Sequence, residues 1–451
     1  MKRREFLTNA ALIGASSTLG IAAPAILTSC STQEKAKRYT SEELGMYSFV
    51  DIAPDGKPLR GALIGCGDRG TGAAIQFLNG GPHVSIVALA DVFPDRMSRC
   101  VDILKKESNN DVPESNRFLG FDAYKKIMAM PDVDVVLLCT PTHFRPEQFK
   151  AAVEAGKHVF MEKPCAVDPA GIRTVIAAAK VAEIKELTVV TGNQRRHHRD
   201  YWEAYVQVKN GLIGDVVSAA AHWNQGAWWN RFPRKEWSDM EYCIRNWFNI
   251  KWLSGDHFLD QAIHNIDVVT WFLGDVPLQA TGFGGRAQRL TGDIFDFFSV
   301  DYTYNNNRKM LATARQIDGC DTNIGERIYG TKGVAIFNVN EGVRIEDYAG
   351  NVVWTYDYKA RPIKDPYHQE HIHLVESIRL GKKINQAQDL AYSTQVAILG
   401  REAAYTGKAI TWDEIMASPL RYGPDTYELG ALPDYHEGVA PKPGRAPEMP
   451  T

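Results

Sequence analysis

Short apolar runs alternate with segments of helical periodicity between Leu59 and Thr191. The apolar runs have the length of buried strands, and the segments between them place apolar residues three and four positions apart. Such alternation is typical of a doubly wound parallel sheet with helices on both faces. The expected strands are residues 60–64, 84–90, 133–139, 158–161 and 187–191, and the expected helices are residues 70–78, 94–106, 122–128, 146–155 and 169–182.

Beyond residue 191 the pattern changes to a β-rich one that is framed by helices. Three consecutive asparagines, Asn305 to Asn307, mark a turn between two strands, so at least part of this sheet is antiparallel. The last 33 residues hold seven of the 22 prolines and predict an extended arm. The expected strands are residues 216–223, 279–288, 296–304, 309–316, 326–329, 334–338, 344–348 and 351–356, and the expected helices are residues 198–209, 367–380 and 389–406.

The N-terminus has the pattern of an export signal. Arg3 and Arg4 precede a mildly apolar stretch that glycines, serines and Pro24 interrupt, so it is a poor membrane-spanning helix. An arginine pair before a weak apolar region predicts twin-arginine export. The alternative is a buried N-terminal helix with a chance arginine pair.

Leu27-Thr28-Ser29-Cys30 closes this stretch and resembles the lipobox of bacterial lipoproteins, which makes Cys30 the lipidated residue. We therefore expect a signal over residues 1–30 and a polar tether over residues 31–58. The predicted location is the periplasmic or cell-envelope side, with the membrane contacted only through the lipid on Cys30.

Composition excludes some partners and leaves one question open. The formal charge is −3 with no long basic tract, which argues against nucleic acid as a partner. The six cysteines other than Cys30 show no CxxC pair, and no His, Cys or Asp set has metal-ligand spacing, so no metal is expected. Cys66, Cys139 and Cys165 fall at predicted strand ends and are interpreted as small buried residues, although a single disulfide stays open.

A glycine-rich loop joins the first predicted strand to the first predicted helix. It reads Gly65-Cys66-Gly67-Asp68-Arg69-Gly70. The three glycines permit a tight turn, close approach of a pyrophosphate, and close packing of helix on strand. The helix N-terminus offers free N–H groups to the phosphates. The loop therefore predicts a dinucleotide site.

The next strand ends in Asp91, which narrows the choice of cofactor. A carboxylate there accepts hydrogen bonds from ribose hydroxyls and repels a 2′-phosphate, so NAD is favoured over NADP. Arg69 and Arg96 are close enough in sequence to offset that repulsion, and a flavin or a non-binding α/β fold is the alternative. The predicted class is α/β: a Rossmann domain over residues 59–191, a substrate-binding α+β domain with a large, mostly antiparallel open sheet over 192–418, and the arm over 419–451.

Two further motifs resemble one enzyme family. They are Cys139-Thr140-Pro141-Thr142-His143 and Glu162-Lys163-Pro164, the latter closing the run that begins at Glu154. With the glycine loop they resemble the Gfo/Idh/MocA family of glucose–fructose oxidoreductases and inositol dehydrogenases, over nearly all of residues 59–412. The resemblance implies that Lys163 lies beside the nicotinamide and the substrate hydroxyl, with Thr140, His143 and Glu162 at the cofactor.

The second catalytic motif of that family matches Asp260 and His264. Helical spacing puts Asp260, His264 and Asp267 on one stripe beside an apolar face, which on its own also describes a solvated helix face. Ala262 stands where the family usually has glycine. An alcohol that gives up hydride must also lose a proton, and imidazole is suited to accept it. Our hypothesis gives His264 the acid/base role and Lys163 the donor role toward the substrate oxygen, and the two residues could also share the proton role. Asp260 would orient the pair or bind a neighbouring hydroxyl.

Six of the ten tryptophans fall between Trp223 and Trp252. Indole faces suit the C–H faces of sugar rings, so Trp228 and Trp229 are substrate candidates; a packed core or a subunit interface is the alternative. Arg195 occupies a position where the family contributes substrate contacts. His371, in a late helix that opens at Tyr367, is a further candidate.

These features favour an exported NAD-dependent oxidoreductase with tightly bound cofactor, acting on a secondary hydroxyl or ketone of a sugar, glycoside or polyol. The alternative is an NAD-dependent glycosidase of the α-N-acetylgalactosaminidase kind, which works by transient oxidation, elimination, hydration and reduction. A third hypothesis is a carbohydrate-binding lipoprotein without activity, against which Lys163, Asp260 and His264 all argue. The resemblance also implies a homo-oligomer.

Overall fold

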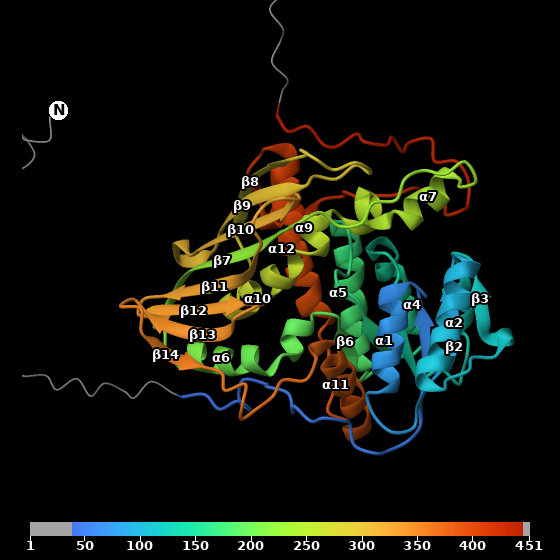
Figure 1. The fold of residues 1–451 in the computed structure, drawn as a ribbon, viewed down its shortest axis with the longest axis horizontal. Helices are drawn as coiled ribbons and strands as arrows, with labels where there is room; N and C mark the ends of the chain where they lie inside the picture. The colour runs from blue at the N-terminus through green and yellow to red at the C-terminus, as the bar shows by residue number, and fades with distance from the viewer. Residues whose placement is uncertain (1–37, 445–451) are drawn as a thin grey trace, which may run out of the picture. The chain divides into compact units, whose positions relative to one another are not determined.

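Six parallel strands form the first of two sheets, in the order β3-β2-β1-β4-β5-β6 (Figure 1). This computed structural model describes residues 38–444, so the predicted signal and Cys30 lie outside the described residues. The doubly wound sheet predicted from the sequence is confirmed, and β3, only three residues long, is the one strand that the pattern did not predict. The strands are β1 (Leu59–Ile64), β2 (Val84–Asp91), β3 (Arg117–Leu119), β4 (Val135–Leu138), β5 (His158–Met161) and β6 (Val189–Thr191).

Helices cover both faces of this sheet because its strands are buried on both sides; all four residues of β4 are buried. Helix α5 shows how the sequence sets an element boundary. Its N-cap residue Asp168 accepts a hydrogen bond from the Gly171 N–H at 2.8 Å, and Pro169 occupies the first turn. The helices are α1 (Asp68–Leu78), α2 (Pro94–Ser108), α3 (Ala123–Met128), α4 (Arg145–Glu154) and α5 (Pro169–Ile184).

Nine strands form the second sheet, in the order β14-β13-β12-β11-β7-β10-β9-β8-β15. Only β10 and β7 pair in parallel, so the sheet is mostly antiparallel, as predicted. Asn306 and Asn307, both with positive φ, turn β9 into β10. The strands are β7 (Val216–Gln225), β8 (Gln279–Gly285), β9 (Phe297–Thr303), β10 (Lys309–Gln316), β11 (Asn323–Gly330), β12 (Gly333–Asn338), β13 (Gly342–Asp347), β14 (Val352–Thr355) and β15 (Ile410–Thr411).

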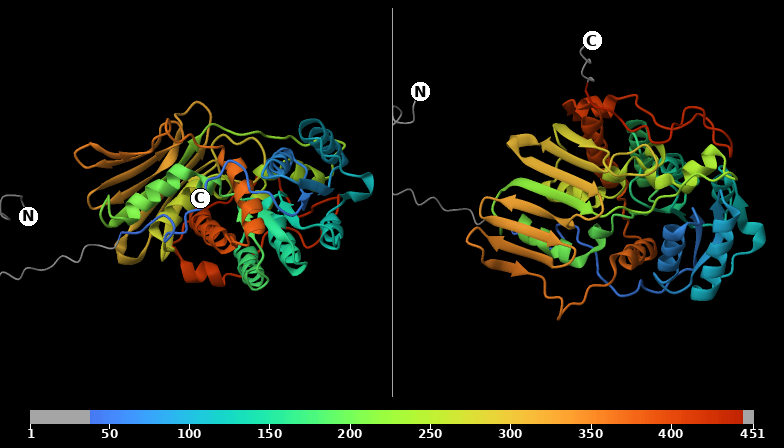
Figure 2. Two further views of the ribbon diagram at one scale, coloured as in Figure 1. Left: turned by 90° about the horizontal axis from the view of Figure 1, so that it is seen from below. Right: turned by 45° about the horizontal axis from the view of Figure 1, so that its top comes forward.

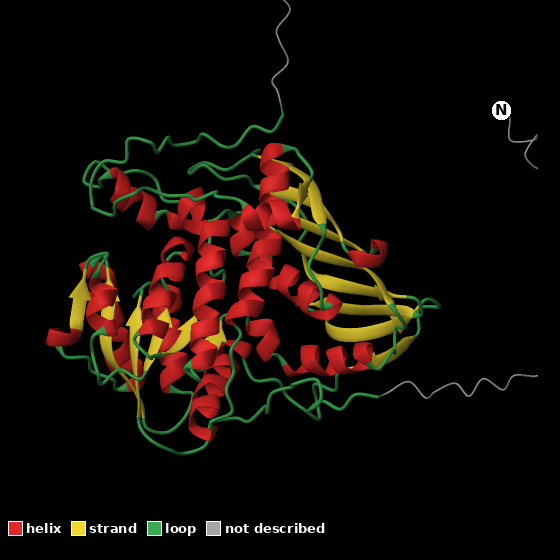
Figure 3. Cartoon of the chain, turned by 180° about the vertical axis from the view of Figure 1, so that it is seen from behind, coloured by secondary structure: helices red, strands yellow, loops and turns green. Residues whose placement is uncertain are grey.

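One face of this sheet packs against helices α6, α10 and α12 (Figure 2). Alternate residues of β10 are buried, which is the pattern of a strand with one covered face. Helix α12 also packs on α5, so helices stand between the two sheets (Figure 3). The helices of this half are α6 (Arg199–Lys209), α7 (Asp239–Arg245), α8 (Lys251–Ser254), α9 (His257–Asp260), α10 (Ile263–Leu273), α11 (Pro366–Leu380), α12 (Ala387–Thr406) and α13 (Trp412–Ala417).

Helix α11 returns to the first sheet, although the sequence assigned it to the second domain. Its residues Ile372, Leu374 and Val375 join the core formed by α1 and the first strands. A boundary drawn along the chain cannot represent this arrangement, because both domains belong to one compact unit from Tyr39 onward.

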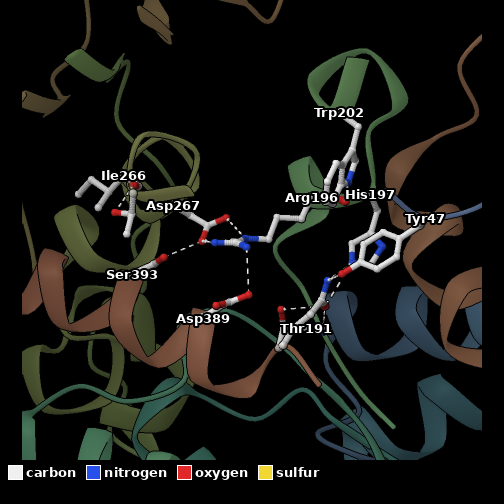
Figure 4. A network of polar contacts seen from close by, with 11 residues as sticks. Tyr47, Thr191, Arg196, His197, Trp202, Ile266, Asp267, Asp389 and Ser393 are labelled. Atoms are coloured by element: carbon white, nitrogen blue, oxygen red, sulfur yellow. Dashed lines mark hydrogen bonds and ion pairs between the residues drawn. The ribbon is translucent and has the colours of Figure 1, made fainter. Parts of the chain in front are cut away.

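The prediction of a polar tether is wrong for the described residues 39–58. Tyr47 stacks on His197 with ring centroids 5.5 Å apart (Figure 4), and the Ser48 carbonyl accepts a hydrogen bond from His373 Nε2 at 2.8 Å. Ala53 is buried. The segment packs because its few apolar residues cover the outer side of α11. Polar residues separate them in the sequence, so they form no apolar pattern that predicts packing.

The C-terminal arm has no helix or strand between Ser418 and Gly444, as predicted. Its packing against the rest of the chain was not predicted. Tyr422 donates a hydrogen bond to Glu402 at 2.9 Å, and the Gly438 N–H donates to the Gly292 carbonyl at 3.1 Å. Tyr427 and Tyr435 join an aromatic cluster with Phe93 and Trp252. The arm therefore embraces its own chain.

All six cysteines in the described part of the chain are free, so none of them forms a disulfide. Cys66 and Cys165 are buried, as expected, whereas Cys139 is partly exposed. Within residues 38–444 no helix is long and apolar enough to cross a membrane. The same residues contain no group of three or more His, Cys, Asp or Glu side chains placed to hold a metal ion.

Candidate active site

A cavity of about 940 Å³ lies between the carboxyl ends of the first sheet's strands and the helices of the second domain. In open α/β sheets, ligands bind at this edge, where the strand order reverses. Here the reversal falls between β1 and β4. The loops after β1, β2, β4 and β5 form one wall, and residues of the second domain from Trp223 to His264 form much of the other.

The glycine loop is shaped to approach a ligand closely. Gly65 has φ +98°, and a Cβ there would meet the Cys139 backbone at 2.7 Å. A Cβ on Gly70 would lie 1.8 Å from the Gly65 carbonyl oxygen, whereas one on Gly67 would meet nothing within 4 Å. Two glycines therefore let helix and strand pack, and Gly67 leaves open space at the cavity wall. With α1 beginning at Asp68, this cradle fits a dinucleotide diphosphate.

Asp91 lies at the end of β2 on the same wall. Its carboxylate accepts hydrogen bonds from the backbone N–H groups of Cys66, at 2.7 Å, and Phe93, at 2.8 Å. Burial raises its pKa, and the hydrogen bonds from Phe93 and Cys66 work against that shift. The carboxylate is thus fixed in orientation, with lone pairs left for ribose hydroxyls. Asp68 also lines the cavity and pairs with Arg99 at 2.6 Å, but both side chains are largely exposed.

Arg69 does not present a free charge to the cavity. It forms ion pairs with the buried carboxylates of Glu162 and, at 2.8 Å, Glu370. Burial alone lowers the pKa of Arg69, but Glu162 and Glu370 outweigh that effect and raise it. The expectation that Arg69 offsets repulsion of a 2′-phosphate by Asp91 is therefore wrong, because its guanidinium is already neutralised. Its contact ties the glycine loop to the loop that carries Lys163.

Lys163 meets Asp260 across the cavity. Its Nζ donates to the Asp260 backbone carbonyl at 2.5 Å and lies 3.7 Å from Asp260 Oδ2. Gln261 Nε2 donates to the same carboxylate oxygen at 2.7 Å, which fixes the rotamer of Asp260. Lys163 precedes a cis peptide bond to Pro164. The three residues line the cavity next to one another and place one ammonium and one carboxylate within reach of a ligand.

His264 lies beside this pair and packs on Trp223, with ring centroids 5.3 Å apart. Burial lowers its pKa well below 6.5, and the positive charges of Lys163 and Arg195 lower it further. Its Nδ1 has no hydrogen-bond partner among the described residues. The imidazole is thus neutral at neutral pH and able to accept a proton.

The predicted continuous helix from Asp260 to Asp267 is broken. Helix α9 ends at Asp260 and α10 begins at Ile263, and Gln261 and Ala262 form a turn between them. Every residue of α10 is buried, so it has no solvated face. Asp267 does not line the cavity and accepts hydrogen bonds from Arg196 and Ser393 (Figure 4). Asp260 and His264, on either side of the break, both line the cavity. Asp267 instead links α10 to α12 through Ser393.

Three predicted site residues do not line the cavity. His143 forms a hydrogen bond through Nε2 with the Tyr427 hydroxyl at 2.7 Å, so its imidazole is engaged by the C-terminal arm. Arg195 pairs with buried Glu326 behind Trp223. His371 is buried against Phe160, with ring centroids 4.2 Å apart, because α11 packs on the first sheet. Arg195 and His371 were assigned from sequence position, which does not show which way α11 or a 3₁₀ turn faces.

The remaining predicted residues line the cavity: Thr140, Glu162, Trp228 and Trp229. Other residues at the cavity were not predicted from the sequence. Arg145 is buried and donates to the Pro164 carbonyl at 2.6 Å, which fixes the loop after Lys163. Tyr367 lies beneath Arg69, with the guanidinium 5.0 Å from the ring centroid. Its position at the start of a predicted helix was the only signal. Gln148, Arg231, Arg245 and Trp247 also line the cavity, as does Arg96, which was expected near Asp91.

A parallel six-stranded sheet with a glycine cradle, facing a second domain that adds a polar cluster, defines a two-domain nucleotide-dependent oxidoreductase. Two family profiles match this chain: an oxidoreductase family with an NAD-binding Rossmann fold over residues 59–191, and the GFO/IDH/MocA C-terminal domain over residues 201–336. The chain belongs to the Gfo/Idh/MocA family of oxidoreductases, and its first domain is NAD-binding.

Individual relatives differ in chemistry. The chain is 26% identical over 298 residues to an inositol 2-dehydrogenase of Rhizobium meliloti, covering 65% of this chain and 79% of that protein. It is 28% identical over 221 residues to a glycosyl hydrolase family 109 protein of Streptomyces coelicolor, covering 48% and 44%. In fold it is similar to scyllo-inositol dehydrogenase from Lactobacillus casei with bound NAD(H) and scyllo-inositol, with a TM-score of 0.59, 22% identity, and 79% and 99% of the two chains covered.

Proposed function

We propose that this protein is an NAD-dependent oxidoreductase that transfers hydride to or from a secondary hydroxyl or ketone of a sugar, glycoside or polyol. The observation that carries the proposal is the convergence of Lys163, Asp260 and His264 on the cavity that also holds the glycine loop. Relatives named as inositol dehydrogenases support a polyol-like substrate.

The chemistry assigns one role to each residue. When bound, NAD supplies the nicotinamide ring that takes up or returns the hydride. Neutral His264 accepts the hydroxyl proton. The Lys163 ammonium donates a hydrogen bond to the substrate oxygen and stabilises negative charge that develops there. Asp260, 3.7 Å from Lys163 Nζ, orients that ammonium.

Asp91 supports NAD over NADP. Its partly buried carboxylate lines the end of the cavity where a ribose would lie, and a 2′-phosphate there would meet like charge. Arg96 lines the same region of the cavity. Arg69 and Arg96 were both expected to weaken the preference for NAD, and of the two only Arg96 is without a carboxylate partner among the described residues. Measuring the dissociation constants of NADH and NADPH for the same preparation tests the preference directly.

Export and cofactor retention form one connected proposal. Arg3-Arg4 and Cys30 support twin-arginine export and lipid anchoring outside the cytosol, where free NAD is scarce. The cofactor then has to be acquired before export and recycled within the site. NAD that co-purifies with the untreated protein, and membrane release on substitution of Cys30 with alanine, are the expected results. Rapid exchange with added nucleotide would contradict retention.

A redox-cycling glycosidase is the second candidate, favoured by the family 109 relatives at 28% identity. The same cavity residues serve both functions, because transient oxidation of a hydroxyl begins the glycosidase cycle. The decisive experiment incubates the purified protein with inositols, methyl glycosides and chromogenic α-N-acetylgalactosaminides. Absorbance of enzyme-bound NADH together with a keto product identifies the oxidoreductase. Release of chromophore without net reduction of NAD identifies the glycosidase.

A further inference from the structure

One ion pair joins the two domains beside the cavity. Arg245, the last residue of α7, makes a bidentate pair with Asp95 at the start of α2, at 3.0 and 3.1 Å. Its guanidinium also lies 4.0 Å from the ring centroid of Phe93 in the first domain. Both Arg245 and Asp95 line the cavity. The segment over residues 226–245, which leads into this pair, therefore closes against the first domain.

The C-terminal arm braces the same segment from outside. The Met240 N–H donates to the Gly430 carbonyl at 3.0 Å, and the Leu432 N–H donates to Asp239 Oδ2 at 3.0 Å. In Figure 1 the arm, drawn in red, runs alongside α7. The arm is in turn tied to the first domain through Tyr427 and His143. Helix α7, at the end of the segment over residues 226–245, is thus held in place at both the cavity side and the solvent side.

Two arginines in this part of the cavity lack an acidic partner. Among the described residues, no carboxylate lies within 4.0 Å of a side-chain nitrogen of Arg96 or Arg231, although both residues line the cavity. Burial lowers the pKa of Arg96, and repulsion from Arg245 and Arg231 lowers it further, against the attraction of Asp91. Arg231 is held in place by stacking on Trp229 at 5.4 Å and by its backbone N–H, which donates to Asn246 Oδ1 at 3.0 Å. Unpaired cations facing one cavity favour an anion between them.

We propose that Arg231 binds the diphosphate half of NAD from the second domain, opposite the glycine loop and Arg96, and that the Arg245–Asp95 pair holds this wall closed. The inference rests on the dinucleotide of the proposed function and adds residues outside the glycine loop and the segments that carry Lys163 and His264. It gives retention of the cofactor a physical basis, since release requires the segment over residues 226–245 to open. The ligand is recognised as a dinucleotide with a negatively charged diphosphate.

The test of Arg231 measures how fast NADH leaves the protein. NADH-loaded wild type, R231Q and R231K are mixed with excess NAD, and the loss of bound-NADH fluorescence is followed. R231Q is expected to release NADH about tenfold faster or more, because a charge-assisted hydrogen bond is lost, and R231K is expected to fall between. R234Q is the matched control, since Arg234 is 61% exposed, pairs with Glu236 and does not line the cavity. Equal release rates for R231Q and R234Q would overturn the proposal.

The pair that closes the wall is tested with D95N, and D102N is its control, because Asp102 lies exposed on the same helix. D95N should accelerate both release and uptake of NADH, whereas R231Q should weaken the salt dependence of binding. Unfolding without NADH checks that neither variant is merely less stable. If D95N exchanges NADH like D102N, the closing role of the Arg245–Asp95 pair is wrong. A wild type that binds no NADH would instead refute the proposed function.

Discussion

Lys163 donates a hydrogen bond from Nζ to the backbone carbonyl of Asp260 at 2.5 Å, and the Asp260 carboxylate lies 3.7 Å from the same nitrogen. The two residues come from different domains, since Lys163 follows β5 and Asp260 ends α9. Their contact sets the distance between the first sheet and the break before α10. The proposed catalytic residues therefore also form a contact between the two domains.

Replacement of Lys163 with methionine should lower turnover by about 10²- to 10⁴-fold, because both proton transfer and charge stabilisation at the substrate oxygen depend on it. NADH binding should persist, since the glycine loop is untouched. Stopped-flow turnover and equilibrium NADH fluorescence measure the two properties separately. K150M is the control, because Lys150 is exposed on α4. A K163M protein with normal turnover would refute the role of Lys163.

The pH dependence of oxidation should reflect His264. Burial lowers its pKa well below 6.5, so the neutral form that accepts a proton predominates at neutral pH. The value of kcat/KM for oxidation should fall only as the pH drops through that lowered pKa, which places the acid limb below pH 6.5. H264N should lose activity at every pH, and H368N, which changes a half-exposed histidine, should leave the profile unchanged. An acid limb above pH 6.5 that H264N removes would contradict the assignment.

Arg69 and Arg99 offer a matched comparison of buried and exposed ion pairs. R69M leaves Glu162 and Glu370 buried without a cation, and we expect the free energy of unfolding to fall by about 3–5 kcal/mol. R99M removes only an exposed pair with Asp68 and should cost less than about 1 kcal/mol. Urea unfolding of both variants measures the difference. The double variant R69M/E370Q should recover part of the loss, and equal effects of R69M and R99M would show that the buried pairs contribute little.

His373 should make stability depend on pH. Burial lowers its pKa from 6.5 to about 4. The unfolded chain then binds a proton that the folded chain does not, so stability is complete above pH 6.5 and falls as the pH drops toward 4. The linkage amounts to roughly 3 kcal/mol. H373Q removes this contribution, so its unfolding free energy should change less between pH 6.5 and 4 than that of the wild type. An identical pH slope in both proteins would show that His373 does not titrate this way.

Local patterns predicted the first sheet well because each of its signals spans few residues. Gly65, Gly67 and Gly70 sit between a strand and a helix that both have clear periodicity, and the structure has the same order. Strands such as β10, predicted over residues 309–316, coincide with the observed Lys309–Gln316 because alternate residues face the helices.

Contacts between residues far apart in the sequence could not be predicted from local sequence patterns. The partner of Arg195 is Glu326, 131 positions away, so nothing near Arg195 showed that its charge was taken. Helical spacing alone favoured a continuous helix, but a turn at Gln261, whose side chain donates a hydrogen bond to the Asp260 carboxylate, separates α9 from α10. Residues 39–58 contain too few apolar residues for a local signal, yet Tyr47 stacks on His197 and Ala53 is buried.

Three alanine substitutions, at the N-cap and in the first turns of α1, should have three different effects. In Gly67→Ala the new methyl group meets nothing within 4 Å, so folding should be normal, but the methyl group occupies open space at the cavity wall. NADH should bind about tenfold to 100-fold more weakly, because the backbone no longer approaches the diphosphate. Gly70→Ala places Cβ 1.8 Å from the Gly65 carbonyl oxygen and should cost roughly 1–3 kcal/mol of stability. Gly72→Ala, whose Cβ is 3.8 Å from its nearest neighbour within α1, should stabilise the protein by about 0.5–1 kcal/mol. Urea unfolding and NADH titration of the same three proteins separate the effects, and unchanged affinity in Gly67→Ala would mean that the diphosphate does not lie against this loop.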